Sequence, residues 1–118
     1  MIEFEAVPEF LKDLEKLSKS YRSIYKDLEV LKKALKAKNP DGVPGTERIS
    51  NLGAGVGLPI YKVKHFRCES LNGRGSRSGI RVIYAFQQEE NKIIFIEMYH
   101  KSNQSNHNRE RILIYFNS

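Results

Sequence analysis

The sequence has few of the residues that form covalent or metal cross-links. Its 118 residues include one cysteine, Cys68, and three histidines, His65, His100 and His107. A single cysteine cannot form a disulfide within the chain, and the histidines do not have the paired ligand spacing that zinc sites need. We therefore expect a protein that works without a metal ion or other cofactor.

The sequence also lacks the long apolar segments that take a chain to or across a membrane. No run reaches 18 apolar residues, and residues 1–5 have neither the basic start nor the apolar stretch of a signal peptide. We expect a soluble, cytoplasmic protein with no membrane partner. Because the chain has 118 residues, 40% of them hydrophobic and 29% charged, residues 1–118 are predicted to form one globular domain.

Positive charge is concentrated in one part of the chain. Lys and Arg number 20 against 14 Asp and Glu, which gives a formal net charge of +6. Most of the excess lies between residues 59 and 81, where one acidic residue accompanies six basic ones: Lys62, Lys64, Arg67, Arg74, Arg77 and Arg81. These residues alternate with apolar ones, which indicates ordered strands rather than a loose tail. A polyanion, nucleic acid first, is the expected partner, and a solvated basic surface is the alternative.

The periodicity of apolar residues predicts a compact α+β domain. Residues 2–6 alternate as in a short strand, and residues 8–21 and 24–35 carry apolar stripes at helical spacing, which predicts a helical hairpin. Residues 39–59 contain five glycines and three prolines, which predicts a long loop that connects two elements or covers a site. Strands are then predicted at 60–68, 80–88 and 92–101, with a turn at 89–91. Residues 106–117 are predicted to form a short helix, with an edge strand at 112–116 as the alternative.

The predicted strand at 60–68 changes phase along its length. Apolar residues stand at odd positions up to Val63 and at even positions from Phe66 onward. A β-bulge near His65 would explain the change and would place Lys62, Lys64, Arg67 and Glu69 on one face. We expect these basic side chains, with Arg77 and Arg81, to converge on the sheet face that the helical hairpin leaves open.

Two places in the last strands carry residues that suit chemistry. Arg81 interrupts an otherwise apolar strand, so it either pairs with Glu69 or Glu97 or faces an anion. The following strand ends in residues 99–101, Tyr-His-Lys. A lone histidine is more often structural than catalytic, but His100 stands beside a cationic strand and is a candidate for proton transfer near neutral pH.

Four features of the sequence resemble one known family: the order of elements, the Tyr-Lys-Val-Lys strand at 61–64, the segment 75–85 and the strand end at 99–101. That family is the RelE/ParE superfamily of toxins from bacterial and archaeal toxin–antitoxin systems. The resemblance spans nearly the whole chain. It implies a RelE-like fold with an N-terminal strand, a helical hairpin, a three-strand antiparallel meander and a short C-terminal helix. It also implies a cytoplasmic toxin that a cognate antitoxin, expected to be acidic, neutralises, and in the RelE branch it implies metal-independent cleavage of mRNA on the ribosome.

The resemblance also suggests a role for individual residues. Arg81 matches the strand arginine that contacts the scissile phosphate, and Lys62 and Lys64 resemble the paired strand lysines of RelE. His100 resembles the histidine of YoeB-type members, although Lys101 stands where those members have tyrosine and Tyr99 precedes the histidine. Glu69 resembles their carboxylate base.

RNA cleavage without a metal ion needs a base for the 2′-hydroxyl, cations for the charge that grows on phosphorus, and an acid for the leaving 5′-oxygen. The predicted catalytic residues are Arg81, His100, Glu69, Lys101 and Tyr99, with Glu97 as the alternative base. The predicted RNA-binding residues are Lys62, Lys64, Arg67, Arg74 and Arg77. Two other functions stay open: a ParE-like toxin that inhibits DNA gyrase by binding alone, and a basic RNA-binding domain without catalysis.

Overall fold

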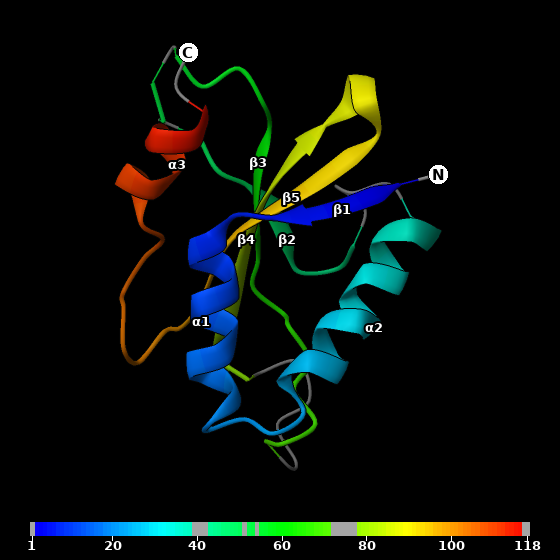
Figure 1. Cartoon of the computed structure of the whole chain (residues 1–118), viewed down its shortest axis with the longest axis vertical. Coiled ribbons are helices and arrows are strands. Elements are labelled where there is room, and N and C mark those ends of the chain that lie inside the picture. The colour runs from blue at the N-terminus through cyan, green and yellow to red at the C-terminus, as the bar shows by residue number, and fades with distance from the viewer. Residues whose placement is uncertain (1, 39–42, 51, 54, 72–77, 117–118) are drawn as a thin grey trace.

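A five-strand sheet in the order β1-β5-β4-β3-β2 runs through the molecule. The computed structural model describes residues 2–38, 43–50, 52–53, 55–71 and 78–116. Figure 1 shows the elements, which are β1 (Glu3–Ala6), α1 (Pro8–Ser18), α2 (Ile24–Ala37), β2 (Thr46–Arg48), β3 (Ile60–Val63), β4 (Ile80–Gln87), the short 3-10 turn η1 (Gln88–Glu90), β5 (Lys92–His100) and α3 (Arg109–Phe116). β1 runs parallel to β5, and the remaining neighbours are antiparallel. The predicted α+β order, including the short C-terminal helix, is confirmed.

The two faces of the sheet carry separate apolar clusters. On one face, Phe10 of α1 and Leu35 of α2 pack with the inward residues of β4 and β5, such as Val82. On the other face, Ile112 of α3 packs with Ile83. The larger cluster follows directly from the helical stripes of the sequence, because each stripe buries its apolar side against the sheet.

Two local predictions are wrong. Residues 46–48, expected to be part of a loop, form β2, which pairs antiparallel with β3 and makes the meander four strands long. Three residues are too few for alternation to be recognised in a sequence rich in glycine and proline. The bulge expected near His65 is also absent, because β3 ends at Val63.

The irregularity of the sheet lies in β5 instead. Ile83 is opposite Glu97 while Tyr84 is opposite Phe95, so Ile96 is an extra residue with no partner in the ladder. Such a bulge shifts the alternation of side chains by one position. Glu97 therefore lies on the same side of the sheet as Ile83, which is the side that α3 covers.

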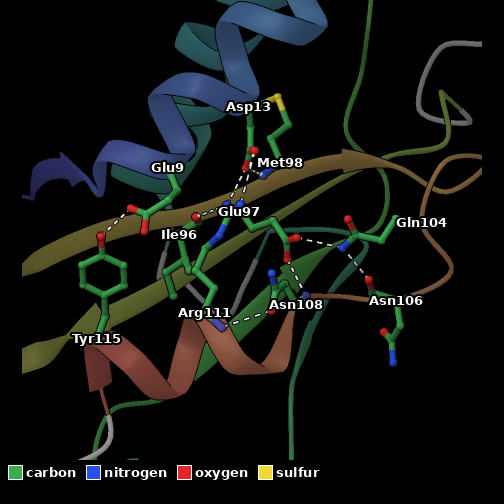
Figure 2. A network of polar contacts seen from close by, with 10 residues as sticks. All are labelled: Glu9, Asp13, Ile96, Glu97, Met98, Gln104, Asn106, Asn108, Arg111 and Tyr115. Carbon is green, nitrogen blue, oxygen red and sulfur yellow. Dashed lines mark hydrogen bonds and ion pairs between the residues drawn. The ribbon is translucent and has the colours of Figure 1, made fainter.

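Beyond Phe95, side chains from α1 and α3 form hydrogen bonds with the edge of β5 that no longer pairs with β1 (Figure 2). β1 stops pairing at Phe95, and beyond it the Met98 N–H donates to Asp13 Oδ2 at 3.1 Å. The Ile96 carbonyl accepts from Arg111 Nη1 at 3.0 Å, and the same guanidinium pairs with Asp13 at 2.6 Å. This half-buried ion pair satisfies the strand edge and fixes α3 against the sheet.

We predict that Asp13→Ala destabilises the protein by about 1–3 kcal/mol, because it leaves the Arg111 guanidinium and a strand N–H without their acceptor. The matched control is Glu15→Ala on the exposed side of α1, which should stay within about 0.5 kcal/mol of wild type. Urea unfolding followed by circular dichroism measures both. Equal stability of the two variants would show that α3 does not depend on this ion pair.

Candidate functional site

Three basic side chains gather on the α3 side of the sheet, beside the part that α3 covers. Lys62 of β3 is opposite Ile83, and Arg81 of β4 is opposite Tyr99, so both side chains share the face of the smaller apolar cluster. Lys64 follows two residues after Lys62, and its carbonyl accepts a hydrogen bond from Arg81 Nη1 at 2.9 Å. We call Lys62, Lys64 and Arg81 the basic cluster.

Arg81 forms no ion pair with any carboxylate in the described part of the chain. The two partners considered from the sequence are engaged elsewhere. Glu69 pairs with Lys26 Nζ at 2.9 Å, and the buried Glu97 accepts from Gln104 Nε2 at 2.8 Å and from the Asn108 N–H at 2.7 Å. A guanidinium without a carboxylate is suited to bind an anion from outside the protein, so Arg81 can bind one.

Lys62 is the most enclosed member of the basic cluster. It is 9% exposed, and its Nζ donates to Asn106 Oδ1 at 2.7 Å. Burial lowers the pKa of Lys62, and the charges of Lys64 and Arg81 lower it further, whereas Glu47 and Glu97 oppose the shift. Lys62 therefore lies within electrostatic reach of both other cations and of two carboxylates.

Tyr99 lies on the same face but is a poor acid. Its ring is part of the smaller apolar cluster, and burial raises the pKa of Tyr99 to about 12, with the charge of Glu97 acting in the same direction and Arg81 against it. The phenol stays protonated at neutral pH. It can donate a hydrogen bond but is badly matched to proton transfer.

His100 lies on the opposite face from Arg81. It is opposite Ile80, whose side chain belongs to the cluster under α1 and α2, and its ring stacks on Tyr21 with centroids 6.0 Å apart. Nδ1 lies 3.0 Å from the Ser102 N–H, so it accepts, and Nε2 then donates to the Ser78 carbonyl at 3.0 Å. The sequence-predicted pair of Arg81 and His100 is therefore not brought together.

The turn before β4 is built closely around this histidine. Gly79 has a positive φ of 82°, and a Cβ at that position would lie 2.8 Å from His100 Nε2. Only glycine fits this backbone without moving the ring. These contacts give His100 a structural role at the end of β5.

The other predicted residues are dispersed. Glu69 lies against α2, where its N–H donates to Asp27 Oδ1 at 3.3 Å, and it is not on a common face with Lys62. Lys101 follows β5 with an exposed side chain, and Arg67 is exposed in the segment after β3. Arg74 and Arg77 lie outside the described residues.

Three residues beside the basic cluster were not singled out from the sequence. Glu47 of β2 is opposite Lys62 and pairs with Lys64 Nζ at 3.2 Å, a position that only the pairing of β2 reveals. Asn106 and His107 come from the irregular connection between β5 and α3. Burial lowers the pKa of His107, and the charge of Lys62 lowers it further.

In the described ranges, no three His, Cys, Asp or Glu side chains form a group that could hold a metal ion. None of the described helices is both long enough and apolar enough to cross a membrane.

The electrostatic coupling within the basic cluster can be measured directly. We predict that Lys62 titrates below the usual lysine value of about 10.4, whereas Lys92, whose pKa is raised by its hydrogen bond to Glu5, titrates above it. Glu47→Gln should lower the pKa of Lys62 further because it removes a negative charge, and Arg81→Met should raise it because it removes a positive one. Carbon-detected NMR titration of the lysine Cε signals distinguishes these directions. A Lys62 pKa that neither variant moves would contradict the proposed proximity.

No family model matches the sequence, and no curated protein matches it either. The fold, in contrast, matches a solved structure, the archaeal RelE-RelB complex from Pyrococcus horikoshii OT3. The match has 16% sequence identity and a TM-score of 0.56, and it covers 85% of this chain and 94% of that chain. The chain therefore has a RelE-like α+β fold, as the resemblance of its sequence implied.

Proposed function

We propose that this protein is the toxin of a toxin–antitoxin system and that it cleaves messenger RNA during translation without a metal ion. The observation that carries the proposal is the basic cluster, in which Arg81 has no carboxylate partner among the described residues and lies beside two lysines. The RelE-like fold supports the same reading. The resemblance of the sequence suggests that Arg81 contacts the phosphate and that Lys62 and Lys64 act as the paired lysines.

The cluster has the properties that phosphoryl chemistry requires. Attack of a 2′-hydroxyl on the neighbouring phosphorus builds negative charge on the phosphate oxygens, and fixed cations stabilise that charge without reorganising. Arg81 offers several N–H donors in a planar fork. Lys62 adds a point charge on the adjacent strand β3, and Lys64 adds another directly after that strand. Their attachment to paired strands holds them in position before the substrate arrives.

Cleavage further needs groups that move protons. Glu69 and His100, the base and the acid suggested by the resemblance, lie away from the basic cluster in this structure. Glu97 is nearer, but its two oxygens hold Gln104 and Asn108. In our proposal the basic cluster therefore binds and stabilises the phosphate, and a different residue transfers the proton.

The partner of such a toxin is an antitoxin protein. The archaeal structure with the similar fold contains RelE together with RelB. For the present chain, with a net charge of +6, we propose an acidic partner whose segment folds across the basic cluster as a strand or a helix and blocks access of RNA.

We predict that Arg81→Ala lowers the cleavage rate of translated mRNA by roughly a hundredfold or more, the size of effect seen when one transition-state donor is removed. Lys33→Ala, which removes an exposed positive charge from α2, is the matched control and should cleave like wild type. Primer extension on mRNA from a translating extract measures the rates, and growth of cells that express each variant gives an independent readout.

The same proteins are assayed for inhibition of gyrase supercoiling. Gyrase inhibition by wild type without any RNA cleavage would replace the proposal with a ParE-like function. RNA binding without cleavage or gyrase inhibition would leave a basic RNA-binding domain.

A second prediction concerns the partner. We expect a neighbouring gene to encode a small acidic protein whose co-expression restores growth. Purified together, the two proteins should form a complex that weakens as salt is raised, because opposite charges attract across their interface. Growth arrest that persists in the presence of the neighbouring gene product would contradict the toxin–antitoxin assignment.

A further inference from the structure

We propose that His107 is the general base of RNA cleavage, accepting the proton of the attacking 2′-hydroxyl beside the basic cluster. This inference rests on the proposed function and adds the proton-transfer residue that it requires. Figure 2 draws part of the polar contacts that residues 104–108 make.

The residues on both sides of His107 are fixed to the sheet. Before it, Asn106 Oδ1 accepts from Lys62 Nζ at 2.7 Å, and the Asn106 carbonyl accepts from Gln104 Nε2 at 2.6 Å. After it, the Asn108 N–H donates to Glu97 Oε1 at 2.7 Å. His107 is therefore held between an anchor on β3 and an anchor on β5, although it belongs to neither strand.

The start of α3 tightens this arrangement. Asn108 Oδ1 accepts from the Arg111 N–H at 3.1 Å, which is the contact of a helix N-cap. Arg111 in turn pairs with Asp13 of α1 at 2.6 Å. The position of His107 is thus determined by a continuous set of contacts that reaches from α1 through α3 to the basic cluster.

The imidazole makes no hydrogen bond within the described part of the chain. Its Nδ1 is buried, and neither Nδ1 nor Nε2 has a hydrogen-bond partner there. A buried polar atom without a partner costs free energy, on the order of 1–3 kcal/mol, so a structural histidine normally has one. His100, whose two ring nitrogens are both hydrogen-bonded, shows the contrast within the same chain.

The surroundings disfavour the charged form of the ring, which leaves more of it able to accept a proton. Burial opposes the charge of an imidazolium, and the positive charge of Lys62 on β3 opposes it as well. Both effects lower the pKa of His107. Glu97 of β5 accepts from the N–H of the next residue, Asn108. Glu47, Lys64 and Arg81 act electrostatically on Lys62.

The chemical step is balanced with these groups. The 2′-oxygen forms a bond to phosphorus while its proton moves to Nε2 of His107, because Nδ1 is buried and carries the proton of the neutral ring, and the bond from phosphorus to the 5′-oxygen breaks. The leaving oxygen takes a proton from water, and the imidazolium later returns its proton to solvent. Lys62, Lys64 and Arg81 stabilise the charge on the phosphate throughout.

The test compares His107→Gln and His100→Gln with wild type in single-turnover cleavage of mRNA on programmed ribosomes across pH. Wild type should lose rate as the pH falls through a pKa below the usual histidine value of about 6.5. His107→Gln should be slower by roughly 10²–10⁴-fold and should lose this acidic limb, whereas His100→Gln should keep it. Binding of the same RNA, measured by fluorescence anisotropy, should be nearly unchanged in both variants.

Chemical rescue by imidazole distinguishes a catalytic role of His107 from a structural one. Added imidazole should restore part of the rate in His107→Ala but not in Arg81→Ala, and circular dichroism checks that each variant is folded. If His107→Gln does not fold, the same comparison is made with His107→Asn. Cleavage by wild type with an acidic limb that survives in the folded His107 variants overturns this inference alone. Absence of cleavage by wild type overturns the proposed function and this inference with it.

Discussion

The extra residue in β5 is the constraint on which the arrangement of this molecule depends. With Ile96 outside the ladder, Ile83 is opposite Glu97 instead of Ile96, and the side chains from Glu97 onward change faces. Without that shift, the carboxylate of Glu97 would point into the apolar layer beneath α1 and α2, where an unpaired charge is costly. With the shift, the carboxylate binds the connection to α3. The bulge also leaves the Ile96 carbonyl available to Arg111, so it fixes the C-terminal helix as well.

The sequence was most informative where a regular pattern determines which side of an element is buried. Both helices, the long strands β4 and β5 and the shared face of Lys62 and Arg81 follow from spacing, because burial of one face forces a period of two or 3.6 residues. The position of the bulge has no comparable signature, since Ile93 to Met98 is almost uniformly apolar. A strand buried on both faces shows no alternation from which its phase could be read. The face of His100 was therefore beyond prediction, because it depends on that phase.

The remaining site residues were missed for a different reason. Glu47 belongs to a three-residue strand inside a segment rich in glycine and proline, and its relation to Lys62 exists only after β2 pairs with β3. His107 lies in an irregular connection, where position is set by individual hydrogen bonds to Lys62 and Glu97 through its two neighbours. Contacts of this kind join residues far apart in the chain, and no local pattern encodes them. The family resemblance did not help either, because it directed attention to the histidine at the end of the last strand.

The hydrogen-bond and ion-pair partners of the basic cluster help to distinguish a surface that only binds RNA from one that also cleaves it. Lys64 pairs with Glu47 and Lys62 with Asn106, so the two lysines are positioned by the protein, whereas Arg81 retains donors for an external anion. A surface that only binds a polyanion needs exposed cations and gains nothing from burying a lysine, because burial weakens its charge. Here Lys62 is buried despite that cost, and it acts electrostatically on His107, whose ring has no hydrogen-bond partner among the residues that the structure describes. An enclosed cation next to an imidazole whose pKa is lowered is the arrangement expected where a proton leaves one atom while charge develops on another, which is why we propose cleavage and not binding alone.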